Sequence, residues 1–412
     1  MSHNRYKALT IFFFSILFMA HLNAQVTIGS KEAPNQGAIL DLKEEGTTTK
    51  GLAMPRVGLS SLTIKDNSNN LATTVKGASE TWDPTAHIGL LVYHAEEYDA
   101  CDPYSIPNGL YVWTGTEWQA QFTLPQDAPE VKIYADTRDG KVDLYRYRKF
   151  GDAGEWMLEN LRYVQPGMKA ALIGDDETDQ CYTYPNPVEA DPAAVPTSWR
   201  PNQGILYTYA AATLGAQDNV TEIEQGQEGE DQGYTHPIIQ GICPPGWHLP
   251  SDREWNELEK EIYNHPNKYS SYALVNGLSP FNPNAWDPEW NTTNNPRGAN
   301  GETGHGLAML STCHPVASPK PYTFGKSSSA GQGGFDILLV GTVEKDAFEL
   351  EYGYGTYFWA SSKSFEEIWI RAFFSDVSSP PNPEAPNPYP AVVRGSVEAS
   401  FIPLSVRCKK NE

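Results

Sequence analysis

The stretch Gly241–Trp255, which reads GICPPGWHLPSDREW, decides the fold of the C-terminal part of this 412-residue chain. Its Pro-Pro pair fixes φ twice and removes two N–H donors, so the chain turns there and cannot form a central strand. Ser251 can then cap a helix, and Glu254, at the third helical position, completes a capping box. Apolar residues at helical spacing predict that this helix, from Asp252 to about Tyr263, faces a core: Trp255, Leu258 and Ile262.

The N-terminus has the three-part layout of a secretory signal peptide. Two basic residues precede the apolar run Ala8–Ala20, and the small residues of Leu22–Ala24 offer a cleavage site before Gln25. The apolar run is too short to span a bilayer comfortably, so we expect residues 1–24 to be removed and not kept as an anchor. We therefore predict an exported protein, extracellular or at the cell surface, with no integral membrane segment after cleavage.

The composition is that of an acidic protein with many aromatic residues and turns. The formal charge is −21, and removal of residues 1–24, which carry two basic residues and no acidic one, takes it to −23. A surface this acidic repels nucleic-acid phosphate, so we expect no nucleic-acid partner. The 12% aromatic content, with 34 Gly and 32 Pro, favours short strands joined by turns. A mature chain of about 390 residues is too long for one core, which predicts at least two domains.

Five cysteines remain after the predicted cleavage: Cys101, Cys181, Cys243, Cys313 and Cys408. An odd number in an exported chain leaves at least one thiol free or paired between molecules. No two of them are close enough to form a zinc knuckle. Their spacing does not determine the connectivity.

Short β-prone segments, most of them opened by a glycine turn, follow one another in the N-terminal part: Gly37–Leu42, Lys50–Val57, Gly89–Tyr93 and Gly109–Trp118. The series resembles the N-terminal module of many exported surface and tail-fibre-like proteins, which implies a spacer or an assembly unit. We predict a β-rich module over residues 25–120. Residues 121–130 lack periodicity and contain two prolines, so we expect a linker there.

The remaining residues, 131–412, are predicted to form the second domain. Val131–Tyr134 and Val142–Tyr147 alternate in polarity on either side of an Asp-Gly turn, which predicts a β-hairpin. The segment ending in Ala210–Ala212 favours a short helix. Four later segments are predicted strands: Gly334–Gly341, Tyr357–Ser362, Trp369–Phe374 and Leu404–Cys408.

The landmarks of this second part, in their order, resemble the Fibrobacter succinogenes major paralogous domain family. After the hairpin come WMLENLRY, LYTYAA, the Cys243–Trp255 motif, GGF, YFWASS and a terminal SVRC, over about residues 131–410. Tyr209 stands where the family motif has a tryptophan. The resemblance implies the C-type-lectin-like fold group. We therefore predict an α+β fold in which the β-rich N-terminal module precedes a domain with a twisted antiparallel sheet, one or two helices and long loops.

In such a lectin-like core, Cys243 and Cys408 are candidates for a disulfide that ties the segment before the helix to the last strand. This bridge would close a loop of about 165 residues and contribute about 4–5 kcal/mol in the chain-entropy model. Cys181 and Cys313 are alternative partners. A free catalytic thiol at Cys243 is the rival interpretation, but no basic neighbour or histidine base stands beside it.

The segment 281–305 is the candidate ligand site. It is long, polar and rich in Asn, Asp and Glu, and in lectin-like folds a long loop between helix and late strands often carries calcium and sugar. Carboxylate and amide oxygens are the ligands that calcium prefers. The candidate binding residues are Trp286, Asp287, Glu289, Asn291 and Asn295. No known sugar-binding signature occurs there, and a plain surface loop is the alternative. We expect no cofactor, with calcium as the one candidate.

The sequence contains no catalytic motif that would define an enzyme. Nucleophile elbows, zinc-protease motifs and phosphate loops are all lacking, so no catalytic residue is assigned. An oxidase of the formylglycine-generating type is a remote alternative, since it needs a redox-active cysteine pair, with copper, in its C-terminal core. Only Cys313 and Cys408 lie beyond residue 250.

We predict an exported, non-enzymatic surface or extracellular protein that acts in binding or adhesion. Its partner is expected to be a glycan or a surface protein. The alternative is a structural subunit of a surface appendage or envelope assembly, and a homo-oligomer fits either function. Analogy to lectins at the level of fold does not establish sugar binding.

Overall fold

The computed structural model describes residues 26–412 apart from 29–30, 32, 34–39, 43–50, 66–67, 123–125, 188–190, 217–237, 294–295, 301–302, 319–324, 345–346, 365–366, 376–389 and 399–400. The predicted signal peptide, residues 1–24, lies outside this range. Among the described residues, no helix combines the length and apolar character needed to cross a membrane.

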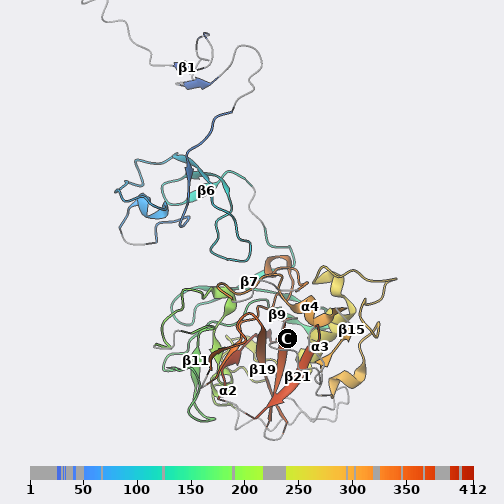
Figure 1. The fold of residues 1–412 in the computed structure, drawn as a ribbon. Coiled ribbons are helices and arrows are strands. Elements are labelled where there is room, and N and C mark those ends of the chain that lie inside the picture. Colours follow the sequence, from blue (N-terminus) through green and yellow to red (C-terminus); the bar gives the residue numbers. More distant parts are fainter. Residues whose placement is uncertain are drawn as a thin grey trace, which may run out of the picture. The chain divides into compact units, whose positions relative to one another are not determined.

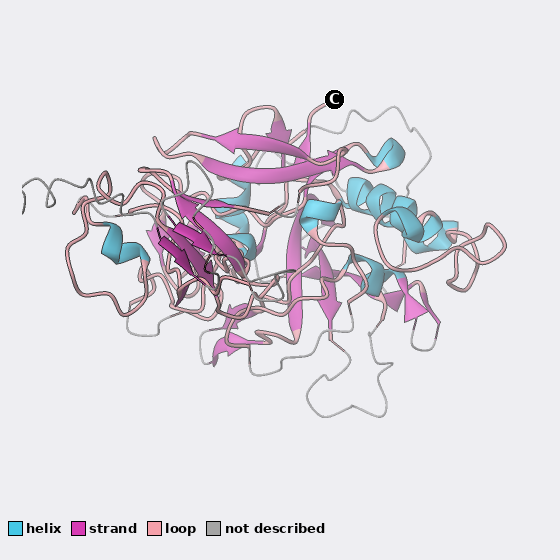
Figure 2. Ribbon diagram, turned by 90° about the horizontal axis from the view of Figure 1, so that it is seen from above, coloured by secondary structure: helices cyan, strands magenta, loops and turns pink. Residues whose placement is uncertain are grey.

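The chain forms two compact units. Unit 1 comprises Met1–Tyr98 and Ile106–Thr123, and unit 2 comprises Asp99–Ser105 and Leu124–Glu412. Strands and loops make up most of both, and helices are few (Figure 2). The predicted β-rich α+β class with long loops is therefore confirmed. The domain limits drawn from the sequence at 25–120, 121–130 and 131–412 stay predictions.

Unit 1 is built on a four-stranded sheet with the order β3-β4-β5-β6. Its last strand, β6, is labelled in Figure 1. The predicted strand, turn and strand at Gly109–Trp118 form its β5–β6 hairpin, in which Trp113 lies opposite Trp118. Both indoles are buried with Leu71 and Tyr111 in the unit's core. The strands are β3 (Arg56–Val57), β4 (Leu91–His94), β5 (Gly109–Trp113) and β6 (Trp118–Ala120). A separate parallel pair, β1 (Val26–Ile28) and β2 (Leu40–Leu42), precedes them.

Unit 2 contains two larger sheets. The five-stranded sheet, in spatial order, consists of β13 (Trp247–His248), β23 (Lys409–Lys410), β9 (Glu155–Met157), β8 (Asp143–Lys149) and β7 (Lys132–Asp136). The eight-stranded sheet consists of β10 (Lys169–Ala170), β11 (Cys181–Thr183), β12 (Leu206–Tyr207), β22 (Leu404–Ser405), β19 (Gly355–Ser364), β20 (Glu367–Phe374), β21 (Val392–Val397) and β14 (Pro296–Arg297). The predicted hairpin is confirmed as β7–β8.

Three helices occur in the described part of unit 2, where one or two were expected: α2 (Tyr209–Thr213), α3 (Asp252–Asn264) and α4 (His305–Met309). Two short antiparallel pairs complete the unit: β15 (Ala299–Asn300) with β16 (Thr303–Gly304), and β17 (Thr342–Glu344) with β18 (Ala347–Leu350). The helix α3 packs on β19 and β20 of the larger sheet (Figure 1).

The start of α3 confirms the capping box. The Ser251 hydroxyl accepts the N–H of Glu254 at 3.3 Å, and the Glu254 carboxylate accepts the N–H of Ser251 at 2.8 Å. Trp255, one turn further on, is fully buried and packs against the rings of Trp156 at 5.2 Å and Phe358 at 5.4 Å. The capped start of α3 is thus followed by an apolar face that packs in the main core.

One predicted strand is wrong. The segment Gly334–Gly341 forms no strand, and its β-type pairing is confined to isolated bridges at Ile337 and Gly341. Asp336 takes a left-handed φ of 53°, which breaks the two-residue alternation that a strand needs. The apolar residues of this segment are nevertheless buried. A short apolar run indicates burial but does not specify the backbone conformation, which explains why the strand was predicted wrongly.

The disulfide predicted between Cys243 and Cys408 is confirmed. Its Cα atoms are 5.8 Å apart, and it links residues 165 positions apart in the sequence. A second bridge joins Cys101 to Cys313, and Cys181 is left as a buried free thiol. One unpaired cysteine is what an odd number requires.

The segment Asp99–Ser105 belongs to unit 2, although the strands before and after it, β4 and β5, belong to unit 1. Besides the Cys101 bridge, Asp102 holds it through a bidentate ion pair with Arg200, with N–O distances of 2.9 and 3.1 Å. The chain therefore crosses between the two units three times.

Replacing both cysteines of the buried bridge, Cys243→Ala with Cys408→Ala, should lower the free energy of unfolding by about 2–5 kcal/mol. The physical reason is that the unfolded chain regains the freedom of a very long loop. Urea denaturation of the non-reduced protein measures the change. The variant Cys101→Ala with Cys313→Ala leaves this bridge intact and serves as the comparison. An unchanged unfolding midpoint in the first variant would contradict the prediction.

Candidate functional site

The loop of residues 281–305 is supported at three points by regular structure. Its middle contains a 3-10 turn, η6 (Pro288–Asn291). Towards its end, β14 pairs antiparallel with β21 at the margin of the eight-stranded sheet, and the loop then leads into α4 at His305. The loop is therefore mounted on the core at its C-terminal end.

Trp286 and Asn291 are brought together by the fold. The Trp286 indole is 7% exposed, and its Nε1–H donates to Asn291 Oδ1 at 2.7 Å. The ring packs against Tyr263 at 5.8 Å and Trp290 at 5.2 Å. Both candidate residues thus make contacts that shape the loop from within.

Asp287 and Glu289 lie nearer to solvent. Asp287 caps η6, because its Oδ1 accepts the N–H of Glu289 at 3.0 Å, and the Glu289 side chain is exposed. Asn295 lies outside the described residues. A ligand at these positions stays a prediction, and the structure shows which of them solvent can reach.

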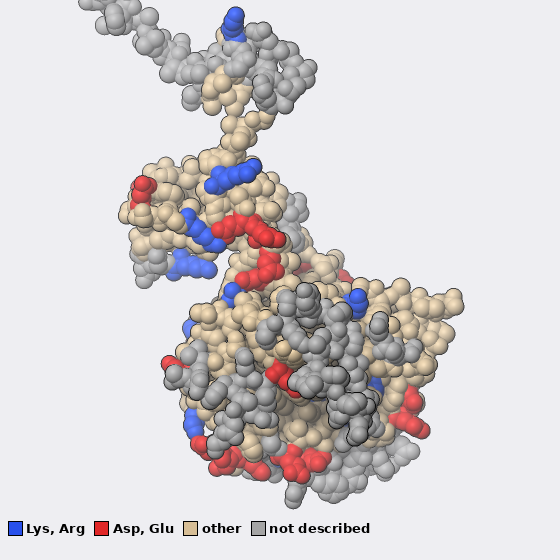
Figure 3. Space-filling model, viewed as in Figure 1, with Lys and Arg blue, Asp and Glu red and all other residues tan. Residues whose placement is uncertain are grey.

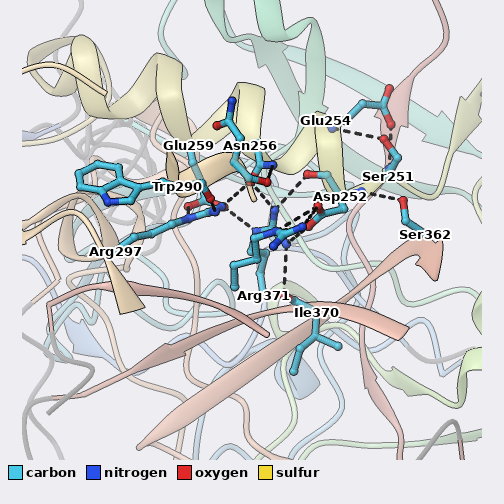
Figure 4. A network of polar contacts seen from close by, with 12 residues as sticks. Ser251, Asp252, Glu254, Asn256, Glu259, Trp290, Arg297, Ser362, Ile370 and Arg371 are labelled. Carbon is cyan, nitrogen blue, oxygen red and sulfur yellow. Dashed lines mark hydrogen bonds and ion pairs between the residues drawn. The ribbon is translucent and has the colours of Figure 1, made fainter. Parts of the chain in front are cut away.

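Three polar side chains of α3 line one face of the helix and form the centre of a buried network (Figure 4). Asp252, Asn256 and Glu259 follow at spacings of four and three residues, so their side chains lie on the same face. They meet arginines from three neighbouring strands, β14, β20 and β21: Arg297, Arg371 and Arg394. All six side chains are buried.

Arg371 is the central member of this network. It donates to Glu259 Oε1 at 2.6 Å, to Asp252 Oδ1 at 2.6 Å and to Asn256 Oδ1 at 2.7 Å. Arg394 stands directly opposite Arg371 in the β20–β21 ladder, an arrangement in which like charges repel. Asp252 resolves this repulsion, since it also accepts a bidentate pair from Arg394 at 3.0 and 2.7 Å.

The electrostatics keep the network ionised. Burial opposes ionisation of Glu259, but the charges of Arg297 and Arg371 outweigh it and hold the pKa of this carboxyl below its usual range. The pKa of Asp252 is lowered against burial in the same way by its two arginines. Burial lowers the pKa of His305, whose Nε2 lies 3.0 Å from Glu259 Oε2.

Arg297 connects the network to the loop. It makes a bidentate pair with Glu259, at 3.0 and 2.6 Å, and donates to the carbonyl of Trp290. Its guanidinium also lies 5.3 Å from the Trp286 ring centre. Because the network has no exposed member, its charges cannot meet a solute. Arg297 thereby ties the loop to α3 at Trp290.

The sequence carried a weak signal for this network. A single arginine inside an otherwise apolar strand, as at Trp369–Phe374, must find a buried partner. Asp252 and Glu259 lie on the same side of α3 as the apolar residues Trp255 and Ile262. Acidic residues on the core-facing side of a helix are a second indication of buried ion pairs. Neither sign tells which acid meets which arginine.

Metal binding at the loop stays an expectation. In the described portion of the chain, no three or more His, Cys, Asp or Glu residues come together as a metal site would require. At Asp287, one carboxylate oxygen is already engaged in the cap of η6. Calcium would need further oxygens to reach its usual six to eight ligands.

Comparison with known families gave two matches. A family model described as the Fibrobacter succinogenes major domain matches residues 152–410. A second, described as a phage tail like trimerisation region, matches residues 27–132. Both resemblances inferred from the sequence are thereby confirmed. No curated protein and no solved structure matches the chain.

The substitution Arg297→Met should lower the free energy of unfolding by about 3–5 kcal/mol, because it leaves Glu259 with one fewer cation in a buried site. It should also raise hydrogen–deuterium exchange in residues 281–305. Arg146→Met removes partly exposed ion pairs with Asp127 and Glu159 and is the matched control, expected to cost about 0–1 kcal/mol. Equal effects of the two substitutions would show that the network does not hold the loop.

Proposed function

This chain belongs to the Fibrobacter succinogenes major domain family, and from this premise we propose that it is an exported, non-enzymatic surface protein. In this proposal, unit 1 assembles three copies and unit 2 presents its loops to a target. The two family matches support a surface or tail-like structural protein. Adhesion and its target are the finer part of the proposal.

The observation that carries the proposal is the match of residues 27–132 to a phage tail like trimerisation region. The match covers the described residues of unit 1 apart from Val26, together with residues 99–105 and 124–132 of unit 2. This overlap supports unit 1 as the part that would assemble. A trimer presents three copies of unit 2 on one particle. Three weak sites that engage one surface together bind far more tightly than one site alone.

The construction of unit 2 supports a role in presentation. Arg297 joins the carbonyl of Trp290 in the loop to Glu259 of α3. A binding segment that is anchored in this way loses less entropy when it binds. On the face drawn in Figure 3, most of the described surface of this unit is uncharged. Such a surface suits a neutral polar ligand, and we therefore propose a glycan before a protein.

The cysteines support the non-enzymatic part of the proposal. An oxidase of the formylglycine-generating type needs a redox-active pair with access to substrate. Cys243 and Cys408 are bonded to each other and both are fully buried, while Cys313 is bonded to Cys101. The remaining thiol, Cys181, is buried, and burial raises its pKa, which disfavours the reactive thiolate.

The mature protein should have three times the mass of one chain in sedimentation equilibrium. The mass should stay constant as the protein is diluted over the micromolar range, because an assembly unit of this kind is expected to be permanent. A mass equal to one or two chains would contradict the trimer.

Glycan-array binding by the mature protein should become at least about tenfold weaker after Asp287→Asn with Glu289→Gln, the loss of one good polar contact. The control is Asp176→Asn with Glu177→Gln, which alters an exposed turn where Asp176 accepts the N–H of the residue two positions on, as Asp287 does. Running the array with and without calcium tests whether glycan binding requires this metal. An array without signal from a protein that is trimeric would favour the structural subunit instead.

A further inference from the structure

The parallel pair β1–β2 of unit 1 carries an exposed apolar face. Ile28 lies opposite Leu42 in the ladder, and Leu40 is two residues from Leu42, so it points to the same side of the strand. The exposed fractions are 56% for Ile28, 52% for Leu40 and 41% for Leu42. We refer to these three side chains as the β1–β2 face.

A face of this kind is incomplete in a single chain. Parallel strands normally occur in sheets that are covered on both sides, and an isolated pair of strands is marginally stable in water. The described core of unit 1 contains Leu59, Leu71, Val92, Tyr111, Trp113 and Trp118, and none of the three side chains joins it. The β1–β2 face therefore lacks a cover within the described part of its own unit.

We propose that the β1–β2 face packs against the same face of two further copies of this chain, around a threefold axis. The inference rests on the proposed trimer and identifies its contact surface. The matched trimerisation region begins at residue 27 and so includes Ile28, Leu40 and Leu42. In a closed threefold assembly, residues near the axis meet their own copies, so one apolar face covers itself. Apolar area removed from water then stabilises both the trimer and the strand pair.

A second exposed apolar surface competes with this one, on the β7–β8 hairpin of unit 2. Leu144 on β8 is 52% exposed, the same fraction as Leu40, and Ile133 on β7 is 49% exposed. This hairpin already belongs to a five-stranded sheet, and its neighbour Tyr145 is buried in a core. Single exposed apolar residues on a supported sheet are ordinary. Leu144 is therefore the matched control for Leu40.

The test compares the mature protein with its variants Leu40→Asp and Leu144→Asp by sedimentation equilibrium. We expect a trimer for the unaltered protein and for Leu144→Asp, and a monomer for Leu40→Asp at the same micromolar concentration, because three carboxylates would meet near the axis. Both positions are exposed in the single chain, so neither substitution should unfold unit 2. An unchanged thermal transition by near-ultraviolet circular dichroism checks this.

The outcomes separate the two proposals. A trimeric Leu40→Asp variant would overturn the β1–β2 face and leave the trimer standing. A monomeric unaltered protein would overturn the trimer itself. Dissociation by both substitutions alike would also overturn the face, since the effect would not be specific to it. In a further measurement, mild oxidation of the Leu40→Cys variant should give a covalent dimer of chains. The control, Leu144→Cys, should give none. A Leu40→Cys trimer that does not crosslink would show that the β1–β2 face lies away from the axis.

Discussion

The ion network between α3 and the strands β14, β20 and β21 is the constraint on which the rest of unit 2 depends. Among the described residues it sets three arginines against two carboxylates, and a buried charge without a partner is very costly. Neighbouring acceptors such as Asn256 Oδ1 and the carbonyls of Asp252 and Ile370 take the remaining N–H groups. A shift of the helix over the sheet would separate these pairs and leave buried charges without partners, so the network favours the observed position.

The position of α3 in turn determines the surroundings of the loop. The helix begins at a capped serine that follows the Pro-Pro turn, and Cys243 just before that turn is bonded to Cys408 beside the last strand. The far end of the network reaches Arg297, which lies within the loop itself. One chain of contacts thus runs from the C-terminal strand, through the helix, to the candidate binding surface.

The sequence predicted those features whose causes are local. The Ser251 capping box, the burial of Trp255 and the β7–β8 hairpin all follow from residues a few positions apart, and each is confirmed. The pairing of Cys243 with Cys408 followed from a family resemblance. The network could not be predicted, because Arg371 lies 119 residues from Asp252 and no local pattern relates them. Gly334–Gly341 was predicted wrongly, since its apolar residues indicate burial but one left-handed residue, Asp336, ends the strand geometry.

The same distinction applies to the candidate site. Asp287 and Trp286 were predicted as binding residues because their residue types suit a ligand. In the structure, Asp287 caps the 3-10 helix η6, and Trp286 is buried in the core. The buried polar side chains of unit 2 find partners largely within the unit, apart from a few atoms such as His305 Nδ1. Both units expose some apolar side chains, such as Leu144 of unit 2 and Leu40 of the β1–β2 face in unit 1. The exposed residue Leu144 belongs to a five-stranded sheet that is supported on its other face, whereas the β1–β2 pair has no further strand among the described residues. This difference in support, and not exposure alone, is the physical reason why we propose that the β1–β2 face meets other copies of the chain.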